Sequence, residues 1–163
     1  MTSTLPDQER IAAQRRTVKE HTDAENTHEY DRVNATFVQD SRAYYEIVPG
    51  GAHFDGIKGV ESFYELLDRV LPDLQWKVTH EYDVPGCSIR EGTASGTHSA
   101  EFAGVPASGN FVSFEVCALY IFDEEQPDKL IAERAYWDND SLIRQMKGDK
   151  DVPSLGMAEN FRR

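Results

Sequence analysis

Apolar residues recur with two different periods along this chain, and the change of period divides the chain into two parts. Between residues 7 and 37 they recur every three to four positions, although a charged stretch at residues 20–26 interrupts them. This spacing predicts one or two amphipathic helices that lie over another layer of the protein. The clearest helical pattern follows at residues 59–71, and Pro72 ends it. Its apolar face consists of Val60, Phe63, Leu66, Leu67, Val70 and Leu71.

From residue 74 onwards the pattern changes to that of β-strands. Residues 42–48 already favour a short strand, which runs into a glycine-rich loop at residues 50–56. Turn residues separate the later strand-like segments, which span residues 74–84, 88–102, 110–122 and 130–137. A short helical pattern follows at residues 142–146. Helices followed by an uninterrupted strand meander predict an α+β fold, in which the N-terminal helices cover one face of a curved antiparallel sheet.

Length and composition fit one domain. The chain has 163 residues, of which 39% are hydrophobic, and this is enough for one core without disulfides or a metal ion. We therefore expect a single domain at residues 1–147 and a polar C-terminal tail at residues 148–163. Three apolar residues in the tail could dock locally or on a partner subunit, namely Leu155, Met157 and Phe161.

Acidic residues dominate the charge of the chain. The 29 Asp and Glu residues stand against 17 Lys and Arg residues, which gives a net charge of -12. The basic residues form no stripe that could neutralise phosphates, so neither nucleic acid nor an anionic membrane is expected as a partner. The N-terminus has no apolar signal core, and no later run approaches the about eighteen apolar residues of a membrane span. We therefore expect a cytoplasmic protein.

One carboxylate directly follows the most aromatic stretch of the chain. Asp138 comes after Tyr136 and Trp137 at the end of the last strand-like segment. A carboxylate beside aromatic rings would be partly desolvated, which favours its neutral form and suits it to proton transfer. The alternative is that Asp138 only caps the following helix, because Asp-Asn-Asp-Ser is a typical helix start. Asp138 is the first candidate for chemistry.

Counting residues across the predicted hairpins places an imidazole near this carboxylate. If the chain turns between Phe102 and Asn110, His98 is level with Phe114 or the residue before it. The next hairpin puts Asp138 level with Phe114 as well. The two side chains would then flank one slot, about 10 Å apart, where Asp138 could take a proton while His98 donates a hydrogen bond or proton. Alternatively, His98 is a half-exposed strand residue without a catalytic role.

Aromatic residues are dense enough to line a cavity for a flat or apolar ligand. We expect His53, from the glycine-rich loop, to lie at the mouth of this cavity. The expected walls are residues that would otherwise be ordinary core, namely Tyr45, Phe63, Trp76, Phe102, Phe114, Tyr136 and Trp137. Glu115 and Glu133 are further candidate carboxylates, although an outward-facing strand position or a cross-strand ion pair is the simpler interpretation of both.

No spacing in the sequence indicates a metal site. The chain has no Cys-x-x-Cys, His-Glu-x-x-His or His-x-His motif. His21 and His28 could share one face of a predicted helix, but a third ligand is not evident. Cys87 and Cys117 fall in different strand-like segments and are expected to be free.

Three motifs, taken together, resemble one known family. They are the Gly-Thr-His block at residues 96–98, the Tyr-Trp-Asp end of the last strand at residues 136–138 and the glycine-led helix start at residues 56–63. This combination is similar to the SnoaL-like polyketide cyclase family, and the resemblance covers about residues 16–146. The chain departs from the family pattern at Ala100, where a glycine is common, and in its unusually polar first helix.

The resemblance implies the cone-shaped α+β barrel of the nuclear transport factor type, in which helices pack on a strongly curved sheet that encloses a pocket. It also implies chemistry without a cofactor. An acidic residue at the end of the late strand removes a proton from an activated carbon, and an intramolecular aldol closure follows. Asp138 matches that acidic position, and His98 matches the histidine of the Gly-Thr-His block.

The resulting hypothesis is a cofactor-independent acid-base enzyme of the polyketide cyclase type, a lyase or isomerase. It would act on a small hydrophobic or aromatic molecule that contains a carbonyl group, with Asp138 as base and His98 as donor or acid. A dehydratase, a hydrolase, an isomerase and a non-catalytic binding protein remain alternatives, because one fold hosts many functions. We also expect a homodimer that forms through the sheet.

Overall fold

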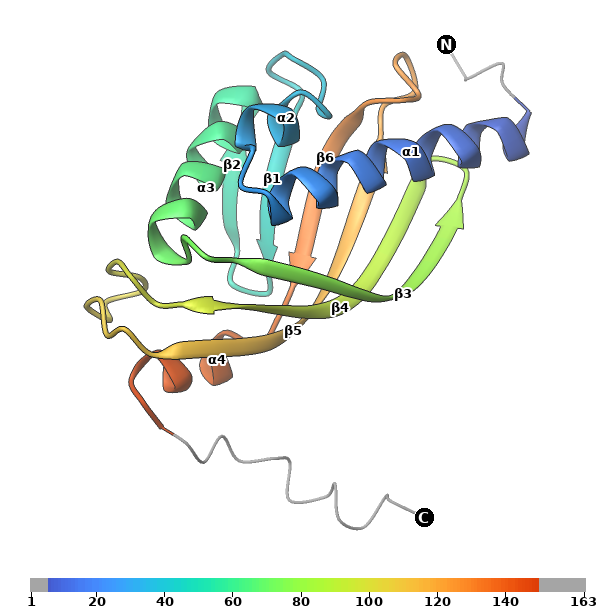
Figure 1. Cartoon of the computed structure of the whole chain (residues 1–163). Coiled ribbons are helices and arrows are strands. Elements are labelled where there is room, and N and C mark those ends of the chain that lie inside the picture. The colour runs from blue at the N-terminus through green and yellow to red at the C-terminus, as the bar shows by residue number, and fades with distance from the viewer. Residues whose placement is uncertain (1–5, 150–163) are drawn as a thin grey trace, which may run out of the picture.

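A computed structural model describes residues 6–149, and its elements follow one another in the order that the change of period predicts (Figure 1). The helices of this part are α1 (Asp7–Asn26), α2 (Tyr30–Asn34), α3 (Gly56–Val70) and α4 (Asn139–Met146). Its strands are β1 (Tyr44–Val48), β2 (Ala52–Asp55), β3 (Gln75–Val84), β4 (Cys87–Thr97), β5 (Phe111–Phe122) and β6 (Leu130–Tyr136). None of the helices within residues 6–149 has the length and apolar character needed to cross a membrane. The predicted docking of the tail residues Leu155, Met157 and Phe161 concerns positions outside the described residues.

The strands form one curved sheet in the order β2-β1-β6-β5-β4-β3. Neighbouring strands are antiparallel, except that β1 and β6 run parallel. The sheet does not close on itself, because β2 and β3 remain at opposite edges. The predicted α+β class, with helices over a curved sheet, is confirmed, and the parallel pair is the one departure from an antiparallel sheet among the described strands.

The sheet bends where β3 is irregular. The register between β3 and β4 shifts between Val78 and His80. Gly92 lies opposite this bulge, where a Cβ atom would come within 2.1 Å of the carbonyl oxygen of Lys77, so a larger residue does not fit. Bulges of this kind bend and twist a sheet. Helices α1 and α3 lie over one face of the bent sheet, as Figure 1 shows.

Two apolar clusters fill the space between the helices and the sheet. The first cluster includes Val33, Phe37 and Tyr64, and it joins α1 to α3 and the middle of the sheet. The second includes Leu71 and Leu142, and it joins the end of α3 to β3, β4, β5 and α4. Residues of both clusters line a cavity that remains between them.

Helix α1 buries polar side chains together with apolar ones. The buried residues of this helix are Gln14, Val18, His21, Ala24 and Glu25. The sequence pattern indicated an interruption at the charged stretch of residues 20–26, but the helix continues through it. Some of the polar residues in this stretch point into the protein. The polar face that weakens the helical pattern in the sequence is the inner face of the helix.

Two predicted boundaries differ from the observed ones, and both differences matter for the site. The glycine-rich loop at residues 50–56 contains β2, which pairs with β1 so that His53 lies opposite Glu46. The strand predicted at residues 88–102 already ends at Thr97. The chain beyond Thr97 forms a wide loop, within which Phe102 and Val105 form an isolated β-bridge. The connection to β5 is therefore longer than the predicted turn between Phe102 and Asn110.

Candidate active site

Asp138 lies at the surface, so the prediction that its carboxylate is desolvated is wrong. Its side chain is exposed and forms the N-cap of α4. One carboxylate oxygen accepts hydrogen bonds from the backbone N–H groups of Asp140 at 3.0 Å and Ser141 at 3.2 Å. The physical reason is that these N–H groups begin a helix and lack partners within it, and the carboxylate supplies one. The alternative interpretation, a helix cap, describes the environment of Asp138.

His98 is buried, but it is not level with Asp138. Its backbone N–H donates to the carbonyl oxygen of Asn110, whereas the residue opposite Phe114 is Ala94. The predicted register is wrong because β4 ends before His98 and the following loop is wider than a hairpin turn. The Nδ1 atom of His98 lies 2.9 Å from Oγ of Ser108, and Nε2 has no hydrogen-bond partner within the described part of the chain.

The two predicted catalytic residues therefore do not share a slot. Asp138 follows the β6 residue Tyr136, which pairs with Cys117 of β5. His98 is level with Asn110, so the two positions lie several residues apart along β5, roughly 17 Å at the rise of an extended strand. The catalytic roles of Asp138 and His98 stay predictions, without the proximity on which they were based.

The cavity between the two apolar clusters has a volume of about 90 Å³. Its wall is almost entirely apolar, and it includes six of the eight residues predicted to bind substrate, namely Tyr45, Phe63, Trp76, Phe102, Phe114 and Trp137. These six residues therefore surround one cavity, and their role in substrate binding stays a prediction. An engineered apolar cavity of roughly 150 Å³ holds benzene, so the space here suits a ligand of few heavy atoms.

His53 and Tyr136, the other two predicted residues, do not line this cavity. His53 belongs to the edge strand β2, pairs with Asp55 at 3.0 Å and stacks on Tyr44. Side chains alternate between the two faces of a strand, so Tyr136 points away from the cavity that the next residue, Trp137, lines. On that outer face the guanidinium group of Arg134 lies over the ring of Tyr136, 5.9 Å from its centre.

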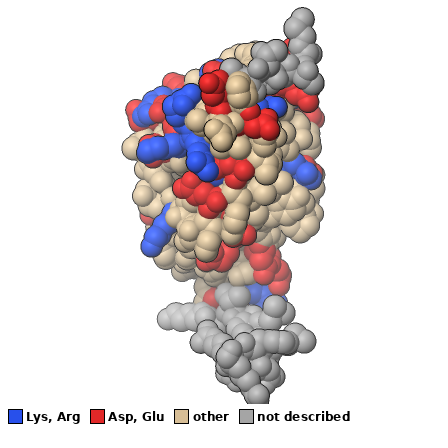
Figure 2. All heavy atoms as spheres, turned by 90° about the vertical axis from the view of Figure 1, so that its right-hand side faces the viewer, with Lys and Arg blue, Asp and Glu red and all other residues tan. Residues whose placement is uncertain are grey.

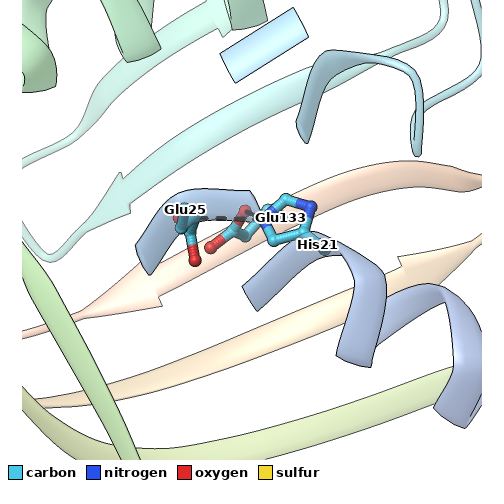
Figure 3. A group of neighbouring side chains, drawn as sticks. All are labelled: His21, Glu25 and Glu133. Atoms are coloured by element: carbon cyan, nitrogen blue, oxygen red, sulfur yellow. Dashed lines mark ion pairs between the residues drawn. The ribbon is translucent and has the colours of Figure 1, made fainter. Parts of the chain in front are cut away.

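A cluster of buried polar groups closes one end of the cavity. His21 and Glu25 come from successive turns of α1, and Glu133 comes from β6, with the three side chains directed toward one another (Figure 3). His21 is fully buried, and Glu25 and Glu133 retain only 7% and 3% exposure. Both carboxylates line the cavity, whereas His21 does not. Tyr64 of α3 completes the cluster.

Glu133 receives the hydrogen bonds of this cluster. Its Oε2 atom accepts from the hydroxyl of Tyr64 at 2.8 Å and lies 3.1 Å from Nε2 of His21. Nε2 is also 3.0 Å from the Tyr64 oxygen and 3.7 Å from Oε1 of Glu25. Glu25 therefore has a close charge as neighbour, at a separation that is too long for a hydrogen bond.

The hydrogen bonds indicate that His21 carries a proton on both ring nitrogens. The hydroxyl of Thr36 donates to the carbonyl oxygen of Val33 at 2.6 Å, so its oxygen is left to accept from Nδ1 of His21 at 2.9 Å. Tyr64 donates to Glu133, so the Tyr64 oxygen and the carboxylate are left to accept from Nε2. An imidazolium ion satisfies all of these contacts.

Burial and charge act in opposite directions on these groups. Burial alone would lower the pKa of His21, but the carboxylates of Glu133 and Glu25 outweigh it and raise the pKa to about 10. Burial raises the pKa of Glu25 above its ordinary value, although His21 opposes this effect. Burial, together with the two nearby carboxylates, also raises the pKa values of Tyr45, Tyr64 and Tyr120 well above the ordinary value. These phenols therefore stay protonated at neutral pH.

The sequence prediction only partly anticipated this cluster. Glu133 was a candidate carboxylate with an ion pair as the simpler interpretation, and the structure contains such a pair, formed with a helix and not with a neighbouring strand. Glu115 is exposed and accepts from Thr93, as expected for an outward-facing residue. His28 lies beyond the end of α1 and contacts the carbonyl oxygen of Leu74, away from His21. The i, i+4 spacing of His21 and Glu25 is the feature of the sequence that indicates their proximity on one helix face.

The same three residues are the group within residues 6–149 that could hold a metal ion, since their donor atoms lie within 4.8 Å of one another. The hydrogen bonds account for them without one, because the imidazolium of His21 already supplies a positive charge between the carboxylates. Cys87 and Cys117 are free, as predicted, and lie on neighbouring strands outside this group.

Comparisons with known proteins agree on family and fold. The family model for SnoaL-like polyketide cyclase matches residues 15–146. A search of curated protein sequences finds no match. Among solved structures, a protein assigned as a SnoaL-like polyketide cyclase from Jannaschia sp. CCS1 is similar, with a TM-score of 0.74 and 17% identity over 88% of this chain and 95% of that one.

Two further structures extend this likeness. IdmH from Streptomyces antibioticus, assigned as a polyketide cyclase, gives a TM-score of 0.66 and 18% identity over 82% of this chain and 98% of that one. A phenazine biosynthesis-related protein from Pseudomonas aeruginosa gives a TM-score of 0.69 and 18% identity over 85% and 88% of the two chains. At this identity the solved structures show the fold alone. The family follows from the match to the family model, which covers most of the chain. The chain belongs to the SnoaL-like polyketide cyclase family.

Proposed function

We propose that this protein is a cofactor-independent acid-base enzyme that transfers a proton on a small carbonyl compound held in the cavity. The observation that carries this proposal is the pair of buried carboxylates at one end of an apolar cavity, where Glu133 is tied to His21 and Tyr64 while Glu25 is not. Two carboxylates in different environments can take different roles in catalysis.

Glu25 is the proton-transfer group in this proposal. The raised pKa of Glu25, caused mainly by burial, brings its carboxyl closer to neutral pH, where a general base is most effective. Glu133 accepts from Tyr64 and His21, and its carboxylate balances the charge of the imidazolium. Tyr45 and Tyr120 line the cavity as protonated phenols, and each can donate a hydrogen bond to an oxygen of the substrate.

The reaction begins with removal of a proton from the carbon next to the carbonyl group. That proton moves to a carboxylate oxygen of Glu25, and the electron pair of the C–H bond moves toward the carbonyl oxygen, where a phenol hydrogen bond stabilises the enolate. In an aldol closure the enolate carbon then attacks a second carbonyl of the same molecule, and Glu25 returns the proton to the new alkoxide. Isomerisation would instead return the proton to another carbon, and dehydration would lose one water.

Proton exchange tests this proposal without knowledge of the natural substrate. Small ketones such as acetone and butanone are incubated with the protein in D₂O, and NMR follows the loss of their α-protons. The wild-type protein is expected to accelerate exchange, and Glu25→Gln to lower the rate roughly 100-fold or more. A matched control is Glu124→Gln, which removes one exposed carboxylate that does not line the cavity.

Two results would overturn the proposal. Absence of exchange with the wild-type protein, when the ketones bind, would favour a non-catalytic binding protein. Unchanged exchange in a folded Glu25→Gln variant would remove Glu25 from the reaction. Product mass separates the alternatives once a substrate is known, because aldol closure conserves mass and dehydration does not.

The expected homodimer is also a proposal, and the outer face of the sheet supports it. Side chains there alternate with those that line the cavity, so Leu119, Ile121 and Tyr136 point outward, and each is only half-buried. Light scattering is expected to give the mass of a dimer for the wild-type protein and of a monomer for Leu119→Glu. A monomeric wild-type protein would contradict the proposal.

A further inference from the structure

The ionisable groups that line the cavity are all acids. Within residues 6–149 its wall contains Glu25, Glu133, Tyr45 and Tyr120, and it contains no Lys, Arg or His side chain. His21, the positive charge nearest to the two carboxylates, lies behind them and does not line the cavity. A ligand in the cavity therefore meets negative charge and hydrogen-bond acceptors at this end.

The buried cluster is also one positive charge short. It holds two carboxyl groups and one imidazolium, and a dry interior tolerates an uncompensated charge poorly. Tyr64 and His21 both direct hydrogen bonds to Oε2 of Glu133, whereas Glu25 has only a contact of 3.7 Å to His21. Burial raises the pKa of Glu25, which favours its neutral form and so reduces this imbalance in the absence of a ligand.

The remainder of the wall suits a compact cation. Aromatic rings from Phe63, Trp76, Phe114 and Trp137 surround the space together with aliphatic side chains. Aromatic faces attract organic cations, and this attraction strengthens when the site is dry. A volume of about 90 Å³ excludes long or polycyclic molecules while the cavity keeps this shape.

We propose that the cavity binds a small alkylammonium ion, with its nitrogen toward Glu25 and Glu133 and its alkyl part against the aromatic wall. This inference rests on the proposed function, because it names the class of its substrate, a small carbonyl compound that carries a protonated amine. A cation beside Glu25 lowers the pKa of its carboxyl group. Binding thus favours the carboxylate form that proton abstraction requires.

Two probes of equal shape test the charge requirement. Tert-butylammonium and tert-butanol differ in charge but hardly in size, and isothermal titration calorimetry measures the binding of each to the full-length protein at neutral pH. Tert-butylammonium is expected to bind at least about tenfold more tightly, the effect of roughly 1.4 kcal/mol from desolvated cation-π and ion-pair contacts. Repeating the titration in buffers of different ionisation enthalpy is expected to reveal a net release of protons, at most one for each bound cation.

Variants identify the group that responds to charge. Glu25→Gln is expected to remove both the preference for tert-butylammonium and the proton release, while Glu124→Gln retains both. The proposal is overturned if tert-butanol binds as tightly as tert-butylammonium to the wild-type protein, or if cation binding releases no proton. Both of these are wild-type measurements, so they decide the matter even if Glu25→Gln does not fold.

The calorimetric result is independent of catalysis. Exchange of ketone α-protons without preference for the cation would leave the proposed function standing and remove the alkylammonium ligand. Cation binding with proton release, but without exchange of any ketone, would support the alkylammonium ligand and remove the proposed function.

Discussion

Two carboxylates five positions apart on one segment, Glu133 and Asp138, have opposite environments. Glu133 is on β6, faces α1 and lies almost fully buried against His21 and Tyr64. Asp138 lies just past the end of the same strand, is exposed and caps α4. Aromatic neighbours in the sequence do not decide which of the two is desolvated. The strand face and the element packed over it decide. The two residues are an odd number of positions apart, so their side chains lie on different sides.

Removal of the buried carboxylate is expected to have the largest effect on this comparison. Glu133→Leu leaves the imidazolium of His21 without its hydrogen-bonded partner, so the free energy of unfolding should fall by about 3–5 kcal/mol. Urea denaturation measures this loss. The double variant His21→Leu/Glu133→Leu removes both charges and should recover most of the stability. A loss below about 1 kcal/mol in the single variant would mean that the pair contributes little.

The pH dependence of stability tests the same cluster from the side of His21. Its pKa of about 10 in the folded protein lies above the ordinary value of 6.5. The contribution of the imidazolium is therefore fully present below about pH 6.5 and is lost as the pH rises through 10, at up to about 1.4 kcal/mol for each pH unit. The groups that face it are Glu133, Glu25, Tyr64 and Thr36.

Thermal unfolding measured between pH 7 and 10 shows whether this loss occurs. The melting temperature of the wild-type protein is expected to fall across this range. The curve of the double variant His21→Leu/Glu133→Leu should be flatter, because it lacks the ionising group. Equal slopes for the two proteins would mean that His21 is neutral in the folded state.

The exposed carboxylate should matter least. Asp138→Ala removes the cap of α4 and is expected to cost about 1 kcal/mol of stability, as measured by urea denaturation. Asp138→Asn keeps a capping side chain and should leave both stability and ketone exchange nearly unchanged. If Asp138→Asn folds normally but abolishes exchange, the catalytic role predicted from the sequence would be restored and the role of Glu25 would be in doubt.

The sequence predicts the fold better than the site, for reasons that individual residues make clear. The apolar face of α3 and the strand periods after residue 74 place whole elements correctly, because burial of apolar area sets both patterns. Strand β2 escaped prediction since only four residues form it, within a stretch rich in glycine. The aromatic wall of the cavity was predictable because large rings are buried by default.

The polar cluster could not be derived in the same way. His21 and Glu133 are more than a hundred positions apart, and only the docking of α1 on β6 brings them together. The pairing of His98 with Asp138 failed because it assumed that the strand continues to Phe102, whereas β4 ends at Thr97. One misplaced turn moves every later residue in the count. Local spacing, such as His21 to Glu25, survives such errors, whereas long counts across turns do not.

The polar inner face of α1 has a consequence for how the protein reaches its native state. Burial of apolar side chains alone favours no single rotation of this helix about its axis, because its inner surface is half polar. Rotation of the helix by one residue, about 100° around its axis, would leave the imidazole of His21 and the carboxyl of Glu25 facing solvent or hydrocarbon. Glu133 on β6 would then lose its partners on the helix. The buried ion pair between α1 and β6 therefore fixes the rotation of the helix, as a single buried polar residue fixes the register of a coiled coil.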